Sequence, residues 1–206
     1  MPDATLAKFP GWQPKRCLAC KNKGQPSTKM PATRRAASSR SFAAAREENL
    51  TTIEVLAKYT AGPKEGVFTD GAAEPNPGPG GWGAVYVTSN RVAVEACGQE
   101  GHTTNNRMEL VALIEGCALV PVGTPAVVYT DSQLCVNSIT KWASAWEARG
   151  WKRKGGEIAN LELVKKLYAL FQRRPELELR WIQAHAGNRW NEYADSLATA
   201  YRRGKR

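Results

Sequence analysis

Four acidic residues stand where their side chains could act together on a bound ion. Asp70 and Asp131 each end a short apolar segment, Glu109 lies in the first turn of a segment with helical spacing, and Asp195 lies in the first half of another. Carboxylate oxygens suit Mg²⁺, and two such ions about 4 Å apart can activate water for phosphodiester cleavage. Each acid taken alone is more typical of a turn, a helix cap or a solvated helix face, so the spacing leaves both interpretations open.

The apolar periodicity predicts the elements that must position these acids. Strands are expected at residues 67–69, 82–88, 91–98, 126–130 and 177–182, with a hairpin turn at Ser89-Asn90. Helices are expected at residues 42–59, 106–119, 132–142, 158–171 and 190–201. Gly71 and the proline- and glycine-rich run at 75–81 are expected to end the first strand and form a turn. This order predicts an α/β fold with a five-stranded mixed sheet and helices on its faces.

The sheet would bring the acids together if its first and fourth strands are parallel neighbours. The carboxyl ends of such strands line the ligand crevice of an open α/β sheet, which would place Asp70 beside Asp131. Glu109 would face inward if Leu110 and Leu113 pack in the core. Carboxylates that share a crevice raise one another's pKa, and divalent cations remove that repulsion.

The charge is concentrated at the amino-terminal end. The 206 residues carry a net charge of +10; residues 1–62 have 11 Lys/Arg and 4 Asp/Glu, and residues 63–206 have 18 and 15. We expect residues 1–62 to form a basic, partly disordered extension with a helix near 42–59, followed by a catalytic domain at 63–206. Such a charge favours polyanionic partners, because Lys and Arg that neutralise phosphates release counterions.

The cysteines and the apolar segments indicate the compartment. Five cysteines, an odd number, suggest a reduced protein without a disulfide framework. Cys17 and Cys20 form a CxxC pair, which is half of a usual zinc site; the alternative is a basic tail that binds nucleic acid electrostatically. We find no secretory signal and no stretch of 18 apolar residues, so we expect a cytoplasmic protein with no membrane segment. Nothing suggests a dimer, and we expect a monomer.

Four co-linear motifs carry a resemblance to a known family. They are FTDG with NPGPGGWG at 68–71 and 76–83, TTNNRMEL at 103–110, TDSQ at 130–133, and AHAGN with NEYAD at 184–188 and 191–195. In this order they resemble type 1 ribonuclease H of the bacterial kind, over about residues 65–202. The resemblance implies the ribonuclease H-like fold and an endonuclease that cuts the RNA strand of RNA–DNA hybrids.

The resemblance also implies roles for the site residues. Asp70, Glu109, Asp131 and Asp195 would hold two Mg²⁺ ions, for which Mn²⁺ is expected to substitute, and cleavage would leave 5′-phosphate and 3′-hydroxyl ends. His185, in a glycine-containing loop, would assist proton transfer or product release. A histidine suits that task because it titrates near neutral pH, whereas the plainer interpretation is a loop residue that caps the next helix.

Further residues match the positions with which the family contacts its substrate. Asn76, Asn105, Asn106 and Gln133 would contact the hybrid, Thr104 and Asn160 would hold a phosphate of the DNA strand, and Arg149, Lys152, Arg153 and Lys154 would form a basic handle. Amides suit the first task because they both donate and accept hydrogen bonds, and the 2′-hydroxyl distinguishes RNA from DNA. Turn formation is the plainer explanation for Asn76, which lies among prolines and glycines.

Three other functions compete with this interpretation. The fold also serves as a scaffold, so a non-catalytic hybrid-binding protein is one alternative, although all four carboxylates are present. A resolvase or transposase on the same fold is disfavoured by the amides and the handle. A ribonuclease H domain cut from a reverse transcriptase is disfavoured because residues 1–62 contain no polymerase motif.

Overall fold

The computed structural model describes residues 49–203. Its five strands form a mixed sheet in the order β3-β2-β1-β4-β5, with β1–β2 and β2–β3 antiparallel and β1–β4 and β4–β5 parallel. The strands are β1 (Gly66–Ala73), β2 (Gly78–Thr88), β3 (Arg91–Thr103), β4 (Ala126–Thr130) and β5 (Leu177–Trp181). The expected five-stranded mixed sheet is confirmed, including the parallel pairing of the first and fourth strands.

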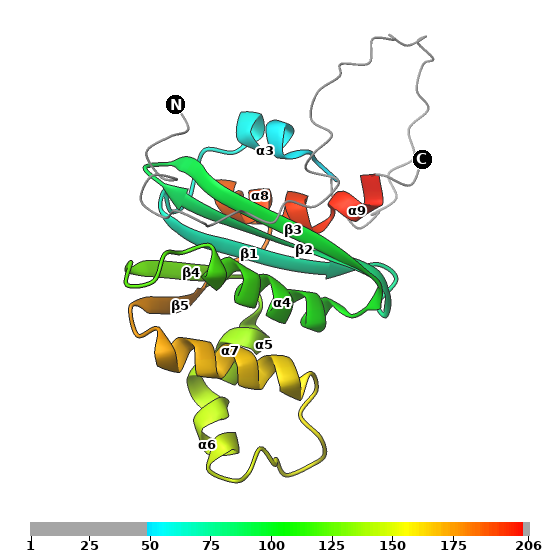
Figure 1. The fold of residues 1–206 in the computed structure, drawn as a ribbon. Helices are drawn as coiled ribbons and strands as arrows, with labels where there is room; N and C mark the ends of the chain where they lie inside the picture. The colour runs from blue at the N-terminus through cyan, green and yellow to red at the C-terminus, as the bar shows by residue number, and fades with distance from the viewer. Residues whose placement is uncertain (1–48, 204–206) are drawn as a thin grey trace.

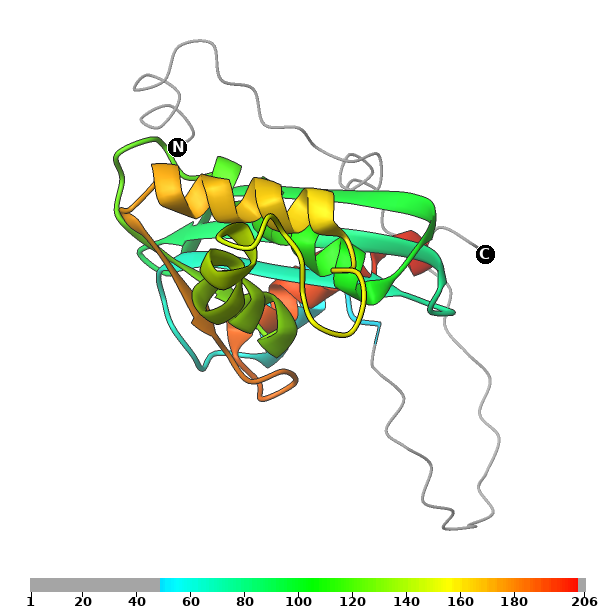
Figure 2. The same ribbon diagram turned by 90° about the horizontal axis from the view of Figure 1, so that it is seen from below.

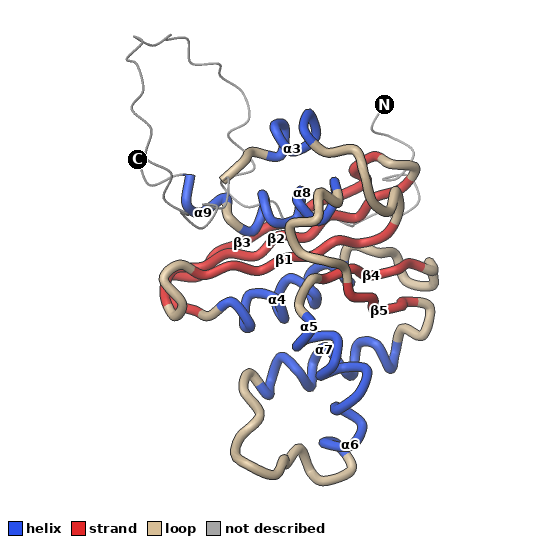
Figure 3. Tube along the Cα trace, turned by 180° about the vertical axis from the view of Figure 1, so that it is seen from behind, coloured by secondary structure: helices blue, strands red, loops and turns tan. Residues whose placement is uncertain are grey.

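Helices cover both faces of this sheet (Figure 1). They are α3 (Thr52–Lys58), α4 (Asn105–Ala118), α5 (Gln133–Asn137), the π-helical η1 (Ser138–Trp142), α6 (Ala143–Glu147), α7 (Leu161–Arg173), α8 (Arg189–Ala198) and α9 (Ala200–Arg203). Helices α3 and α8 lie on one face and α4 on the other, with α5 to α7 beyond it, as the view from behind in Figure 3 also shows. Figure 2, seen from below, shows α7 running across this second helical layer.

Each face of the sheet has its own apolar core. Helices α4 and α7 bury Leu113 and Leu167, both 0% exposed, against β1 and β4. On the other face α8 buries Ala194 and Leu197 against β1 and β2, together with Phe68. The two cores fix the positions of α4 and α8, which carry Glu109 and Asp195, relative to β1 and β4, near which Asp70 and Asp131 lie.

The glycine-rich run at 78–81 differs from the expected turn. It is the first part of β2, and β1 likewise continues past Asp70 to Ala73. Glycine is accepted in these strands because a helix lies against them: a Cβ at Gly83 would come within 2.5 Å of the Ala194 carbonyl oxygen on α8. The turn at Ser89-Asn90 is confirmed, and both residues have positive φ, as a tight two-residue hairpin requires.

Residues 49–62 pack on the sheet domain. Helix α3 begins at a capping box in which Thr51 and Glu54 exchange hydrogen bonds, and it buries Val55. Arg189 of α8 donates to the Leu56 carbonyl at 2.9 Å, and Ser196 donates to the Leu50 carbonyl at 2.9 Å. Residues 49–62 are therefore continuous with the sheet domain. Residues 42–48 of the expected helix, and the CxxC pair, lie outside the described residues.

The cysteine expectation is met only in part. Cys117 and Cys135 are free and buried, whereas Cys97 is disulfide-bonded, which departs from a fully reduced set. No helix within residues 49–203 has both the length and the apolar character needed to cross a membrane.

The packing of α3 predicts a specific loss of stability. We expect Val55→Ala to lower the free energy of unfolding by about 2 kcal/mol, because two buried carbons are lost and a cavity remains. Val55 is 1% exposed, whereas Ile53 on the same helix is 67% exposed, so Ile53→Ala is a matched control with little effect. Urea unfolding followed by circular dichroism measures both; equal losses would show that α3 does not belong to the core.

Candidate active site

The parallel pairing of β1 and β4 places two of the acids side by side. Thr69 pairs with Thr130 in this register, and both threonines are buried. The residues that follow them, Asp70 and Asp131, therefore stand at the same level of the sheet. Asp131 lies just beyond the end of β4, as expected, whereas Asp70 lies within β1.

Glu109 reaches the same place because α4 lies unusually close to β1. A Cβ on Gly71 would come within 2.2 Å of the Glu109 backbone nitrogen, so only glycine permits this approach. Thr104 caps the helix, with its side chain accepting from the Arg107 backbone nitrogen at 3.3 Å. Glu109 is the fifth residue of α4 rather than part of its first turn.

Asp195 is brought in by α8 through a second close approach. Gly83 of β2 pairs directly with Asp70, and the missing side chain of that glycine leaves room for Ala194. The next residue along α8 is Asp195, which lies in the second half of the helix rather than the first. Four acids from four elements thus converge.

These acids line one open pocket of about 430 Å³. Its lining comprises Asp70, Gly71, Ala72, Ala73, Glu74, Asn105, Glu109, Asp131, Ala184, His185, Asp195 and Arg202. His185 belongs to the loop between β5 and α8, is exposed, and has a positive φ of 48°. The structure therefore gathers all five residues predicted to be catalytic around one cavity.

The electrostatics of the pocket are those of repelling carboxylates. Burial raises the pKa of Asp70 well above its ordinary value, and the charges of Asp131, Asp195 and Glu109 raise it further. Burial also raises the pKa of Asp131, and it raises the pKa of Glu109 to about 7 against the lowering effect of a hydrogen bond from Ser132. Such a cluster favours bound protons or added positive charge.

Three neighbours that sequence reasoning missed hold these acids. Ser132 Oγ donates a hydrogen bond to Glu109 Oε2, and the thiol of Cys135 lies 3.7 Å from the same oxygen. Asn191 Nδ2 donates to Asp131 Oδ2 at 3.2 Å. Their positions in the sequence could have indicated these contacts, because Ser132 follows Asp131 directly and Asn191 lies one helical turn before Asp195.

The amides predicted to contact substrate fall into two groups. Asn105 lines the pocket, and its side chain accepts from the Ala73 backbone, while its own backbone donates to Asn76 Oδ1 at 3.3 Å. These bonds tie the start of α4 to the β1–β2 connection. Asn106 and Gln133 are exposed residues in the first turns of α4 and α5 and do not line the pocket.

The other predicted contacts lie outside the pocket. Asn160 precedes α7 in a left-handed conformation and makes no side-chain cap, and Thr104 uses its hydroxyl to cap α4. The handle residues Arg149, Lys152, Arg153 and Lys154 are all exposed. They occupy the segment between α6 and α7, which projects away from the sheet (Figure 1).

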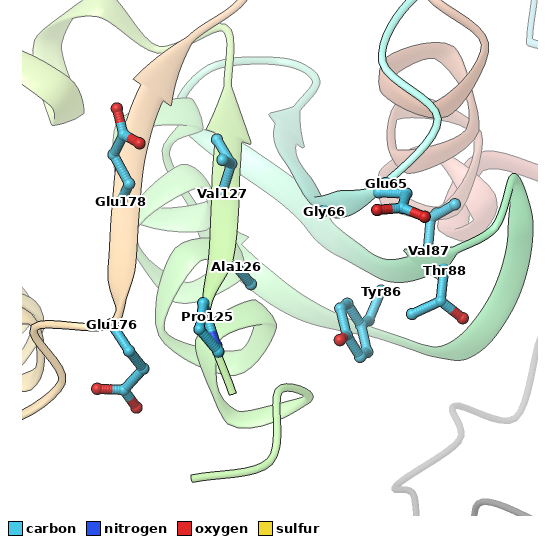
Figure 4. A pocket seen from close by; sticks show the side chains of 10 residues that line it. All are labelled: Glu65, Gly66, Tyr86, Val87, Thr88, Pro125, Ala126, Val127, Glu176 and Glu178. Atoms are coloured by element: carbon cyan, nitrogen blue, oxygen red, sulfur yellow. The ribbon is translucent and has the colours of Figure 1, made fainter. Parts of the chain in front are cut away.

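A second hollow, of about 310 Å³, contains none of the predicted residues (Figure 4). It lies at the opposite ends of β1 and β4, and its lining includes Tyr86 and three glutamates, Glu65, Glu176 and Glu178. Glu176 and Glu178 are already ion-paired with Arg174 and Arg180, at 2.9 and 2.6 Å. Of these two pockets, the first is the one that gathers acids from four different elements.

Known proteins share this fold and these motifs. The family model described as RNase H matches residues 63–203. Ribonuclease H of Methylorubrum extorquens (strain PA1) is 44% identical over 137 residues, which are 66% of this chain and 59% of that protein. Ribonuclease HI of Caulobacter vibrioides is 45% identical over 139 residues, which are 66% of this chain and 91% of that protein.

A solved structure agrees with the sequence relatives. LC9-RNase H1, described as a type 1 RNase H with the type 2 active-site motif, superimposes with a TM-score of 0.57 at 33% identity, covering 71% of this chain and 76% of that chain. Fold and relatives together define an α/β nuclease. The chain belongs to the ribonuclease H family, as the resemblance of its four motifs implied.

The raised carboxylate pKa values predict an inverse pH dependence of stability in the absence of divalent cations. Glu109 has an ordinary pKa of 4.5 and a folded pKa of about 7, so the folded state binds the extra proton between these values. The free energy of unfolding should therefore fall as pH rises through this window, by at most about 3 kcal/mol from Glu109 alone.

Urea unfolding in EDTA across the window measures this effect. Glu109→Gln should flatten the dependence, because the amide does not titrate. The same fall in that variant would show that Glu109 is not the group responsible.

Proposed function

We propose that this protein hydrolyses the RNA strand of RNA–DNA hybrids, leaving 5′-phosphate and 3′-hydroxyl ends. The observation that carries the proposal is the convergence of Asp70, Glu109, Asp131 and Asp195 on one pocket in a chain of the ribonuclease H family. The proposal also takes the protein to be a cytoplasmic monomer.

The pocket fits two Mg²⁺ ions, or Mn²⁺ in their place. The atoms that could coordinate a cation there are hard carboxylate oxygens. In addition, the buried Oδ1 of Asn191, whose amide contacts Asp131, has no protein hydrogen-bond partner. Within residues 49–203, no three His, Cys, Asp or Glu side chains are grouped so that they could hold a metal ion by themselves. Mg²⁺ keeps several waters and takes only one or two carboxylates per ion, so waters would supply the remaining ligands. Bound in pairs, such ions activate a water and stabilise the leaving oxygen.

The chain's own residues would position the reacting groups. Ser132 and Asn191 hold the carboxylates of Glu109 and Asp131, both of which line the pocket, through hydrogen bonds. His185, on an exposed loop at the rim, would carry a proton to or from the reacting phosphate or assist product release. The exposed loop gives the imidazole room to reach the substrate.

Discrimination between the strands would fall to the amides and to a phosphate pocket. Asn76 and Asn105 stand at the pocket side of the β1–β2 connection, and Asn106 and Gln133 at exposed first turns. Their amides would recognise the 2′-hydroxyls of the RNA strand. Thr104 and Asn160 would hold a phosphate of the DNA strand.

A cleavage assay tests the proposal directly. End-labelled RNA–DNA hybrid, RNA duplex and DNA duplex are each incubated with the full-length protein, with Mg²⁺ and with EDTA. We expect Mg²⁺-dependent cutting of the RNA strand in the hybrid alone. Hybrid binding without any cutting would instead indicate the non-catalytic binding protein.

Asp70→Asn separates catalysis from binding. The substitution keeps the shape of the side chain and removes one negative charge, so we expect cleavage to fall by roughly a thousandfold or more while hybrid binding survives. In EDTA at neutral pH the variant should be more stable than wild type, because it removes one of the repelling carboxylates. Full activity in Asp70→Asn would refute the metal site.

The basic handle should contribute to hybrid binding through its charge and take no part in the cleavage step. Replacement of Arg149, Lys152, Arg153 and Lys154 by glutamine should weaken hybrid binding and lower the slope of log K against log salt by up to about 3 to 4. Binding measured by fluorescence anisotropy at several salt concentrations tests this. We further propose that the basic segment 1–62 adds affinity in the same way; an unchanged slope in the handle variant would exclude the handle from the interface.

A further inference from the structure

One cation stands among the acids of the pocket. Of the described residues that line it, Arg202 is the only Lys or Arg, and Glu74 is a fifth carboxylate at its rim. A phosphodiester that enters this pocket brings its neighbouring phosphates with it. These phosphates would be repelled by the acids unless a cation at the rim meets them.

Backbone contacts connect Arg202 to the catalytic acids. The Thr199 backbone nitrogen and hydroxyl both donate to the Asp195 carbonyl, at 2.9 and 2.8 Å, and the Arg202 nitrogen donates to the Thr199 carbonyl at 3.0 Å. Tyr201 is 9% exposed and packs where Gly81 has no side chain. Helix α9 therefore presents Arg202 from a position linked to Asp195.

Arg202 donates from Nε to the Tyr201 hydroxyl at 3.1 Å, and its ion-pair partner is the exposed carboxylate of Glu74. Its Nη1 lies 3.2 Å from Glu74 Oε2, and the side chain of Glu74 is 69% exposed, against 21% for Arg202. Exposed ion pairs contribute little to stability, and a guanidinium binds a phosphate through paired hydrogen bonds. Glu74 can thus give way to a stronger anion without disturbing the fold.

We propose that Arg202 binds a backbone phosphate of the nucleic acid next to the phosphodiester held by the four carboxylates, and that Glu74 occupies Arg202 until that phosphate arrives. Arg202 then sets the position of the strand, while the chemistry stays with the acids. This inference rests on the proposed function, since it assumes that a phosphodiester enters the pocket.

The test compares Arg202→Gln with a matched control. Arg180→Gln on β5 breaks an exposed ion pair of the same kind, with Glu178 at 2.6 Å, away from the pocket. We expect Arg202→Gln to raise KM for the hybrid by roughly tenfold with kcat nearly unchanged, because one charged hydrogen-bonded contact is lost. Arg202→Lys should recover part of the loss, the salt slope of binding should fall by about 1, and Arg180→Gln should match wild type.

Glu74→Gln gives a second, opposite readout. It should lower KM by roughly twofold when Arg202 is present and leave KM unchanged in the Arg202→Gln background, because the two effects share one guanidinium. A single neutral methylphosphonate can be placed in turn at each position near the cut. At one position it should weaken hybrid binding by the wild-type protein and leave binding by Arg202→Gln unchanged.

The outcomes separate this inference from the proposed function. If wild type cuts the hybrid and Arg202→Gln behaves like Arg180→Gln, Arg202 is not a phosphate ligand and the proposed function stands. If wild type does not cut the hybrid, the proposed function fails, and hybrid binding by the same variants in EDTA still decides the phosphate contact. Thermal melting controls for folding; if Arg202→Gln melts early, Arg202→Lys and Glu74→Gln carry the test.

Discussion

The burial of several carboxylates beside one another is the constraint on which the rest of the structure depends. Asp70, Glu109 and Asp131 all have raised pKa values, and for each of them burial is the largest cause. Such a cluster does not assemble by its own attraction. It persists because the sheet and its two apolar cores hold the backbone of each acid in place, so the stability of the fold supports an arrangement that is unfavourable on its own.

Glycines determine how closely the acids can approach. Gly71 lets α4 touch β1, and Gly83 lets α8 touch β2 opposite Asp70. A side chain at either position would push a helix, and the acid it carries, away from the pocket. The composition of these strands, which resembles that of a turn, is therefore explained by the distance between helix and sheet.

Residues 49–62 also help to hold the helix that carries Asp195. Helix α3 covers α8, and the carbonyls of Leu50 and Leu56 accept hydrogen bonds from Ser196 and Arg189. Arg203 adds two more bonds, to Asn49 and to the Leu50 carbonyl. Helix α8 carries Asp195 and Asn191, so residues far from the pocket in sequence hold the helix that completes it.

The amino-acid sequence by itself determined the identity of the acids and the order of strands and helices, and it indicated that Asp70 would lie beside Asp131 if the first and fourth strands pair in parallel. Those features follow from local periodicity and from motifs at short range, which a single chain displays directly. Only the tertiary structure decided how the sites are supported. The extension of β1 past Asp70 depends on α4, which lies against Gly71, and the start of β2 depends on α8, whose Ala198 carbonyl oxygen lies where Gly81 has no side chain. The contact of Asn191 with Asp131 and the place of Arg202 beside Glu74 join residues separated by 60 positions or more, and no local pattern records such a contact.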